Sequence, residues 1–149
     1  SAPFLNRLAQ IGLSGVKDSS FDIMVFYSYL RIVKKQGFIP IVGTEALLLP
    51  AVAMGAHGSV SGLANAFPEP VVELFNAVKR GDMEEAGPLQ MKVSAMRDIM
   101  HYGPTLPMIQ AVLRRRGVNA GYPRLPFVLP DEGLLNKAIG DFKGMGVLL

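Results

Sequence analysis

Short apolar runs alternate with longer segments of helical periodicity over the first 80 residues of the sequence. Three runs are expected to be strands, at residues 13–16, 38–42 and 55–65. Four segments repeat apolar residues at helical spacing, at residues 4–11, 21–36, 46–54 and 68–78. Strand and helix therefore alternate, which predicts parallel β/α units whose strand ends meet at one edge of a sheet.

The helix expected over residues 21–36 has recognisable signals at both ends. Ser19 or Ser20 is a suitable N-cap, and a glycine follows the last periodic residue. Lys34 and Lys35 in the expected last turn are favourably placed for the helix dipole. Much of its circumference is apolar, so we expect this helix to contact neighbours on two sides: the sheet, and either another helix or a partner subunit.

After residue 80 the pattern changes to helices alone. A helix is expected over residues 82–101, with Asp82 as its N-cap and an interruption at Gly87 and Pro88. Two more are expected over residues 104–116 and 131–144, separated by a loop rich in glycine and proline. The sequence therefore predicts a C-terminal helical domain that follows the β/α units.

Three strands are too few for a free-standing parallel sheet, which would leave two open edges and a poorly covered face. Either strands come from another chain, or residues 1–80 are the rear part of a larger barrel. Residues 81–149 would then be a helical domain attached to that barrel. The expected fold class is α/β in either case.

The amino-acid composition limits the classes of protein to which the chain can belong. Half of the 149 residues are hydrophobic and 18% are charged, which favours a densely packed fold over disorder. The longest apolar run, at residues 46–54, is too short to span a bilayer, and no secretion signal opens the sequence. The absence of cysteine excludes disulfides, thiolate metal sites and cysteine nucleophiles. We therefore expect a cytoplasmic protein without a membrane partner.

The net charge of +3 is spread thinly along the chain. Its one dense cluster, three arginines at residues 114–116, closes an expected helix, where it favours the helix dipole. A surface that binds nucleic acid usually has a broader basic face with interleaved aromatic residues. The sequence shows no such face, so no nucleic-acid partner is expected. The two histidines and the scattered carboxylates show no metal-ligand spacing, so no metal site is expected either.

One lysine is notable for its position. Lys17 comes directly after the apolar run at residues 13–16 and before a turn. Proteins of the α/β class collect their chemistry at this place, the carboxyl end of a strand. Spacing alone does not distinguish Lys17 from the solvated lysines that are common at such positions. The lysine therefore needs further context before it predicts any chemistry.

Three motifs in order supply this context. They read G-V-K-D-S-S at residues 15–20, G-T-E at residues 43–45 and G-A-H-G-S-V-S-G-L-A-N at residues 55–65. In spacing and order they resemble the sixth, seventh and eighth barrel strands of the family of dihydrodipicolinate synthase, N-acetylneuraminate lyase and 2-keto-3-deoxygluconate aldolase. The later G-Y-P-R-L-P at residues 121–126 looks closest to the sugar-acid aldolases of that family.

The resemblance covers essentially the whole chain but only part of the family's fold. It implies strands 6–8 of a TIM (β/α)8 barrel with their helices, followed by a C-terminal helical extension, because a complete barrel needs about 250 residues. The partner implied is the N-terminal half of the barrel, from a separate chain or segment. Family members commonly form tetramers, so a homo-oligomer is also implied.

The activity implied by the resemblance is class I aldolase chemistry, without a metal or a cofactor. The lysine that matches Lys17 forms a Schiff base with the keto carbon of pyruvate or another 2-keto acid. The nucleophile must be a free amine, and burial lowers the pKa of a lysine, about 10.4 in water, because desolvation disfavours its charged form. We therefore expect Lys17 to be buried. A 2-keto-3-deoxy sugar acid is the favoured substrate, with cleavage or formation of a C–C bond.

The resemblance also implies a set of substrate-binding residues: Gly43, Thr44, Glu45, Val60, Ser61 and Gly62. The first two match a loop beside the keto-acid carboxylate or the hydroxyl tail, and Glu45 offers a carboxylate to sugar hydroxyls. A first-turn acid that stabilises the following helix explains Glu45 equally well. The other three match the strand that closes over the imine, although close backbone packing also explains Gly62.

Part of the family's machinery lies outside this sequence. Its proton-shuttling tyrosine and its glycine–threonine carboxylate-binding motif belong to earlier strands, and Tyr27 and Tyr29 occupy packing positions on a helix. We therefore expect no turnover from the chain alone. Two alternatives stay open: a dihydrodipicolinate synthase-like condensation or 2-keto acid dehydration, and a non-catalytic half-barrel that serves assembly or regulation.

Overall fold

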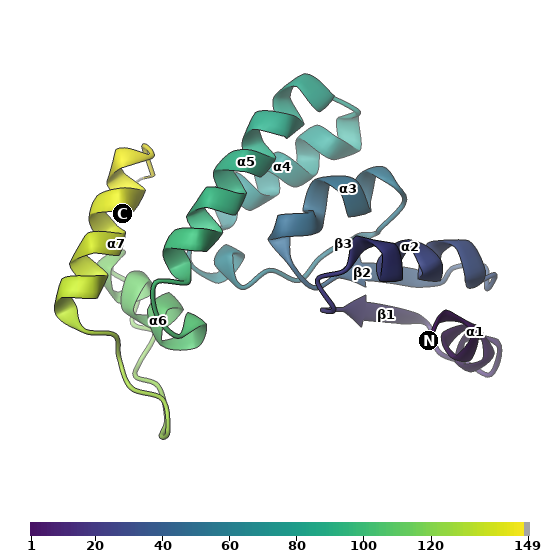
Figure 1. Cartoon of the computed structure of the whole chain (residues 1–149), viewed down its shortest axis with the longest axis horizontal. Helices are drawn as coiled ribbons and strands as arrows, with labels where there is room; N and C mark the ends of the chain where they lie inside the picture. The colour runs from purple at the N-terminus through teal and green to yellow at the C-terminus, as the bar shows by residue number, and fades with distance from the viewer. Residues whose placement is uncertain (148–149) are drawn as a thin grey trace.

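The computed structural model describes residues 1–147, which form a three-stranded parallel sheet with helices (Figure 1). The strands are β1 (Gly15–Asp18), β2 (Ile39–Val42) and β3 (Gly58–Ser59), in the order β1-β2-β3. The α-helices are α1 (Ala2–Gln10), α2 (Ile23–Ile32), α3 (Leu48–Ala53), α4 (Pro68–Arg80), α5 (Met83–Met100), α6 (Thr105–Arg115) and α7 (Glu132–Gly144). Two 3-10 helices, η1 (Glu45–Leu47) and η2 (Leu63–Asn65), follow β2 and β3. The predicted alternation of parallel strands and helices is confirmed.

The register of the sheet sorts side chains between its two faces. Lys17 is paired with Ile41, and Ile41 with Gly58, so these three residues share one face. Val42 is the next residue along β2 and therefore points to the opposite face, where it is 1% exposed. Lys17, by contrast, is exposed. We call the side that carries Lys17 the open face and the side that carries Val42 the packed face.

One hydrophobic core lies on the packed face and continues into the C-terminal helices. It includes Phe26 of α2, Val42 of β2, Leu74 of α4 and Met96 of α5. Figure 1 shows α3, α4 and α5 gathered to one side of the three strands, and α4 and α5 pack against each other. The core reaches α7 at Phe142. The β/α units and the helical region therefore share a single core across residue 80.

The N-terminus of α2 differs from the prediction. Phe21 has a left-handed φ of 60°, which breaks the helical path before Ile23. The Asp22 carboxylate accepts two N–H groups of the first turn, at 2.8 and 3.2 Å. The N-cap expected at Ser19 or Ser20 is therefore wrong, because Asp22 holds that position.

The C-terminus of α2 also comes earlier than predicted. The backbone is already extended at Val33, and the N–H of Lys34 donates to the Asn6 side chain of α1 at 3.1 Å. This contact draws the chain away from the helix axis and towards α1. Lys34 and Lys35 therefore lie beyond the helix, and the prediction that they occupy its last turn is wrong.

Two strands are shorter than predicted, and one helix is continuous where an interruption was expected. β1 begins at Gly15 because the N–H of Leu13 still donates to the Leu8 carbonyl of α1, at 3.1 Å. β3 keeps only two residues of the expected run, because the chain bends into η2 soon afterwards. α5 is continuous through Pro88, so the expected interruption is wrong. Since proline lacks an N–H group, the helix loses one hydrogen bond there but keeps its path.

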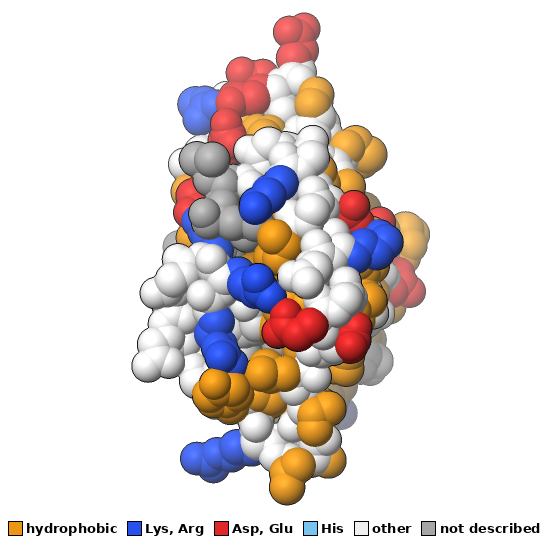
Figure 2. All heavy atoms as spheres, turned by 90° about the vertical axis from the view of Figure 1, so that its left-hand side faces the viewer, with side chains coloured by type: hydrophobic (Ala, Val, Ile, Leu, Met, Phe, Trp, Pro, Cys, Tyr) orange, Lys and Arg blue, Asp and Glu red, His pale blue; other side chains and the backbone are white. Residues whose placement is uncertain are grey.

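The side formed by α6 and α7 carries mixed charges. In Figure 2, Lys and Arg side chains are interspersed with Asp and Glu across this side. Arg115 is 2.5 Å from Glu132, and Arg116 reaches α4, where it is 2.8 Å from Glu69 and lies over the ring of Phe67. The arginine cluster therefore links helices, in addition to the dipole role expected from the sequence. Within residues 1–147, no helix has the length and apolar character that crossing a membrane requires.

Candidate active site

Lys17 lies inside β1, on the open face, one residue before the strand ends. Its Nζ donates to Ser19 Oγ at 2.9 Å. The side chain is exposed, so the burial expected from the sequence is not supplied by residues 1–147. The reason is the architecture, since the helices that follow β1 and β2 cover only the packed face.

Gly43 joins the ends of β1 and β2 beside this lysine. Its N–H donates to the Asp18 carbonyl at 2.6 Å. A Cβ added at Gly43 would overlap the Ser19 hydroxyl and would lie 2.6 Å from the Asp18 carbonyl oxygen. Glycine is therefore required where the two strands end, and it keeps the Ser19–Lys17 pair next to the loop that follows β2.

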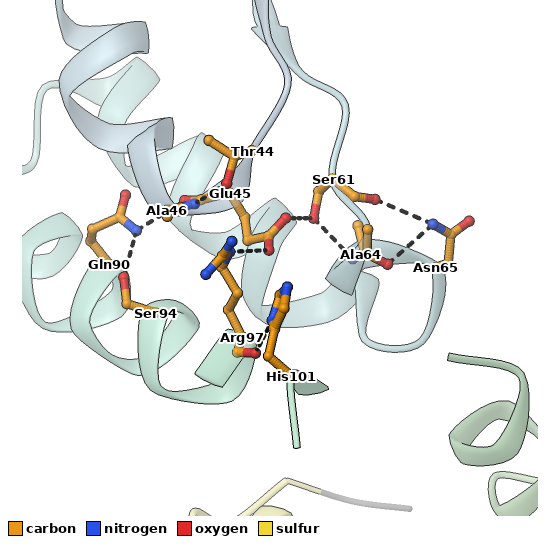
Figure 3. Close-up of polar contacts among 11 residues, drawn as sticks. Thr44, Glu45, Ala46, Ser61, Ala64, Asn65, Gln90, Ser94, Arg97 and His101 are labelled. Atoms are coloured by element: carbon orange, nitrogen blue, oxygen red, sulfur yellow. Dashed lines mark hydrogen bonds and ion pairs between the residues drawn. The ribbon is translucent and has the colours of Figure 1, made fainter. Parts of the chain in front are cut away.

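Glu45 connects the loops after β2 and β3 (Figure 3). It is 4% exposed, and its Oε2 accepts a hydrogen bond of 2.6 Å from Ser61 Oγ. Its Oε1 lies 3.5 Å from Nε of Arg97, which comes from α5. Thr44 is also buried, and its Oγ1 accepts the N–H of Ala46 at the start of η1. The carboxylate is thus bound by side chains from two other elements and does more than stabilise the helix that follows it.

Val60 and Gly62 complete the set predicted from the sequence. Val60 follows β3 by one residue, donates its N–H to the Val42 carbonyl at 2.9 Å and is 52% exposed. A Cβ added at Gly62 would lie 3.8 Å from Ile109 and would make only ordinary contacts. Close backbone packing therefore does not require glycine at position 62, in contrast to position 43.

A pocket of about 210 Å³ lies where these strand-end loops meet the C-terminal helices. Residues of the loops after all three strands line it, together with residues of α5 and the start of α6: Phe21, Gly43, Thr44, Glu45, Gly62, Leu63, Arg97, Met100, His101 and Thr105. Lys17 is outside this lining and adjoins it through Ser19 and Gly43. Gly43, Thr44, Glu45 and Gly62 line this pocket, and Ser61 bonds with Glu45, so five of the six predicted substrate-binding residues belong to, or bond with, one pocket wall beside the lysine.

Comparison with known proteins identifies the family to which this arrangement belongs. The sequence profile of the dihydrodipicolinate synthetase family matches residues 4–138. The chain belongs to this family. The family assignment agrees with the resemblance found in the three strand-end motifs.

Individual relatives match across nearly the whole chain. A DapA-like lyase of Halobacterium salinarum is 34% identical over 145 residues, which are 97% of this chain and 47% of the relative. The structure of dihydrodipicolinate synthase from Bacteroides thetaiotaomicron is 34% identical with a TM-score of 0.83, covering 94% of this chain and 50% of that one. A 2-keto-3-deoxygluconate aldolase variant of Sulfolobus solfataricus shares the fold, with a TM-score of 0.83 at 23% identity over 95% of this chain and 48% of that one.

The chain spans about half the length of the curated relatives it matches. Its α/β fold with three parallel strands corresponds to the C-terminal half of the dihydrodipicolinate synthase structures. Other members of the dihydrodipicolinate synthetase family in this comparison are lyases and synthases. The expectation of a family of such enzymes is confirmed at this level.

The tyrosines near Lys17 lie on the other side of the sheet. Tyr27 donates to the Pro50 carbonyl at 3.4 Å, and Tyr29 packs against the core beneath α2. Burial, and secondly the Asp18 carboxylate, raise the pKa of the Tyr29 hydroxyl. A group that is held protonated on the packed face is poorly placed to exchange protons with a ligand on the open face.

Six residues of the pocket wall are absent from the set predicted from the sequence: Phe21, Leu63, Arg97, Met100, His101 and Thr105. Arg97 and His101 come from a helix about 50 residues after Glu45, and no local spacing connects them with the strand-end motifs. Phe21 was assigned to a helix, whereas it precedes the N-cap. Within residues 1–147, no three His, Asp or Glu side chains form a group that could hold a metal ion.

Proposed function

We propose that this chain supplies the imine-forming lysine and part of the substrate pocket of a Schiff-base, class I aldolase or lyase. Lys17 is the proposed nucleophile, and pyruvate or a pyruvate-derived 2-keto acid is the proposed substrate. The observation that carries the proposal is the position of Lys17 on the open face, beside the loops that hold Gly43, Glu45 and Ser61. The family assignment and the order of the three strand-end motifs support it.

The proposed site works only in a completed barrel, by which we mean this chain together with the segment that supplies the remaining strands. Two observations support this partner. The chain spans about half of its relatives, and the open face carries Ile39 and Val60 at 42% and 52% exposure beside Lys17. Covering this face would remove Lys17 from water, which favours the free amine over the ammonium form.

The proposed reaction has a balanced sequence of steps. The Lys17 amine adds to the keto carbon of the substrate and water leaves, which gives a protonated imine. In cleavage, the bond between C3 and C4 breaks and its electron pair moves into the imine to form an enamine, while the C4 hydroxyl loses its proton to a base. Protonation of the enamine at C3 and hydrolysis of the imine then release pyruvate and regenerate the lysine. The base must come from the remaining strands.

A 2-keto-3-deoxy sugar acid is the proposed substrate. The support is the pocket beside Lys17, which presents the Glu45 carboxylate and the hydroxyls of Thr44 and Thr105 to a ligand tail. Groups of this kind recognise hydroxyls by hydrogen bonds. The G-Y-P-R-L-P sequence at residues 121–126 gives separate support, through its resemblance to sugar-acid aldolases.

Condensation of pyruvate with a different aldehyde is a second candidate. It is favoured by the 34% identity to the dihydrodipicolinate synthase of Bacteroides thetaiotaomicron. The two candidates share the Lys17 imine and differ in the aldehyde. Release of pyruvate from 2-keto-3-deoxygluconate by the completed barrel supports the sugar-acid proposal, and the absence of release favours the second candidate.

Trapping tests the imine itself. The completed barrel is incubated with pyruvate and borohydride, and the modified peptide is identified by mass spectrometry. We expect a reduced adduct on Lys17. A protein without an adduct on this residue would contradict both candidate reactions and would favour a non-catalytic half-barrel. The 149-residue chain alone is expected to show no turnover, because the proton-shuttling base is not among its residues.

A further inference from the structure

Arg97 contacts the loops that follow two of the three strands and reaches the third through Glu45. Its guanidinium carbon is 5.5 Å from the centroid of the Phe21 ring, in the loop after β1. Its Nε is 3.5 Å from the Glu45 carboxylate, after β2, and that carboxylate accepts the Ser61 hydroxyl, after β3. One side chain of α5 therefore connects the loops at the carboxyl edge of the sheet, and Figure 3 shows the part of this link that runs from Arg97 through Glu45 to Ser61.

The same helix also fixes the backbone of Glu45. Gln90 is buried, and its Nε2 donates to the Glu45 carbonyl at 3.0 Å. Its Oε1 accepts the N–H of Leu49 at 2.9 Å, so the amide group bridges η1 and α3. The main chain and the carboxylate of Glu45 are thus held by two different side chains of α5. This double attachment leaves Glu45 little freedom to adjust to a ligand.

The Glu45 carboxylate keeps hydrogen-bonding capacity towards the pocket. A carboxylate offers about four lone-pair positions. Among the described residues, Ser61 donates a hydrogen bond to it and Arg97 forms an ion pair with it at 3.5 Å. Because Glu45 and Arg97 both line the pocket, the remaining positions can accept hydroxyl groups of a ligand that enters from Lys17.

We infer that Arg97 is a positioning residue for the substrate tail: it orients the Glu45 carboxylate to bind hydroxyls beyond the reacting carbons. This inference rests on the proposed function. Arg97 is not assigned to the Schiff-base carbon, because Lys17 lies outside the lining of the pocket to which Arg97 belongs. The helical region outside the barrel therefore takes part in choosing the aldehyde, and has no part in forming the imine.

The test separates binding of the two substrates in the completed barrel. The reaction measured is the condensation of pyruvate with D-glyceraldehyde, the aldehyde released from 2-keto-3-deoxygluconate. It gives a KM for pyruvate and a separate KM for D-glyceraldehyde. Arg97→Met keeps most of the apolar stem and removes the guanidinium. Without the guanidinium, the Glu45 carboxylate should no longer be oriented to accept a hydroxyl of D-glyceraldehyde. Loss of a hydrogen bond to a charged group of this kind should raise KM for D-glyceraldehyde about tenfold to a hundredfold. KM for pyruvate and the rate of trapping at Lys17 should stay within about twofold.

Two further variants keep the result interpretable. Arg97→Lys retains the charge but loses the planar guanidinium, so it should restore part of the loss in KM for D-glyceraldehyde. It also serves if Arg97→Met fails to fold. Arg80→Met removes an exposed arginine that pairs with Glu85 and should change neither KM.

Each other outcome counts against a stated claim. Equal rises in both KM values, or no change in either, would overturn the positioning role and leave the Lys17 proposal intact. An unmodified protein that forms the adduct but does not accept D-glyceraldehyde would overturn the sugar-acid proposal and this inference with it. A protein without any adduct at Lys17 would overturn the proposed function as a whole.

Discussion

The two faces of the small sheet differ in what they hold. The packed face buries Val42 and joins a core that runs from α2 to α7, and its residues are nearly inaccessible to water. The open face presents Lys17 and Ile39 to solvent, although both come from strands of the same sheet. Stability is therefore concentrated on one face and the proposed chemistry on the other.

This difference separates the contacts that hold the described elements together from the face that the proposed site uses. Burial of one large apolar side chain contributes about 1.5–3 kcal/mol, so the many buried side chains of the packed face contribute more to stability than the exposed side chains of the open face. The seam between the faces is the carboxyl edge of the sheet, where Gly43 and Glu45 lie. Substitutions on each face and at the seam should therefore have separable effects.

The largest effect is expected on the open face, from Lys17→Arg. A guanidinium stays charged and cannot form the imine, so turnover of the completed barrel should fall by about a thousandfold or more. The stability of the chain alone should hardly change, because the side chain is exposed there. Lys34→Arg, at another exposed lysine, is the matched control and should retain full turnover. A Lys17→Arg protein that keeps a tenth of its activity would break the proposed division between the faces.

The next effect is expected in the core, from Phe142→Ala. Phe142 is fully buried and its ring centroid is 4.7 Å from that of Phe67, so its removal should cost about 3–5 kcal/mol in the free energy of unfolding. Phe4→Ala, at a residue 58% exposed, should change this free energy by less than about 0.5 kcal/mol. Urea unfolding followed by circular dichroism measures both. Equal losses would show that α7 is not part of the shared core.

A smaller effect is expected at the seam, from Gly43→Ala. The added methyl group overlaps the Ser19 hydroxyl and crowds the Asp18 carbonyl, which should cost about 1–3 kcal/mol and displace the Lys17 partner. Gly62→Ala is the matched control, since its Cβ meets only ordinary contacts. In Gly43→Ala we expect both the free energy of unfolding and the rate of pyruvate trapping at Lys17 to change. In Gly62→Ala we expect neither quantity to change. The opposite ranking would contradict the described geometry of the seam.

The smallest effect is a pH dependence on the packed side, at Glu69. A hydrogen bond from Arg116 holds the pKa of the Glu69 carboxyl below its ordinary value near 4.5. A carboxyl with a depressed pKa in the folded state stabilises the protein above its unfolded pKa, and this contribution is lost as pH falls through the folded pKa. Because Glu69 is largely exposed, the contribution should be less than about 1 kcal/mol at pH 7.

Urea unfolding of the unmodified chain and of Glu69→Gln measures this contribution. The difference between the two proteins should be largest near pH 7 and should shrink as the pH falls below the ordinary pKa of about 4.5. A difference that grows as the solution becomes more acidic would contradict the assigned sign. The activity of the completed barrel should be unaffected by this variant at pH 7.

The features that the sequence predicted well are those that depend on periodic burial. Alternating apolar runs predicted the three parallel strands and the helices between them, and the strand ends did bring Gly43, Glu45 and Ser61 together. Local hydrogen bonding was less predictable. Asp22 rather than a serine caps α2, because the left-handed φ of Phe21 moves the helix start by two residues.

Long-range polar contacts could not be predicted from one sequence. Arg97 and Gln90 meet Glu45 across about 50 residues, and a single buried carboxylate gives no spacing by which to find its partners. The exposure of Lys17 also escaped prediction. The sequence pattern of an apolar strand is the same whether its second face is covered by this chain or by another segment.

The most direct test of the division between the faces is the rate of pyruvate trapping at Lys17 relative to Lys34 in the same sample. In the completed barrel we predict that borohydride fixes pyruvate on Lys17 while Lys34 remains unmodified. In the chain alone, where Lys17 is exposed, the two lysines should react at similar slow rates. Equal labelling of both lysines in the completed barrel would contradict the account, because the open face would then have no selective chemistry.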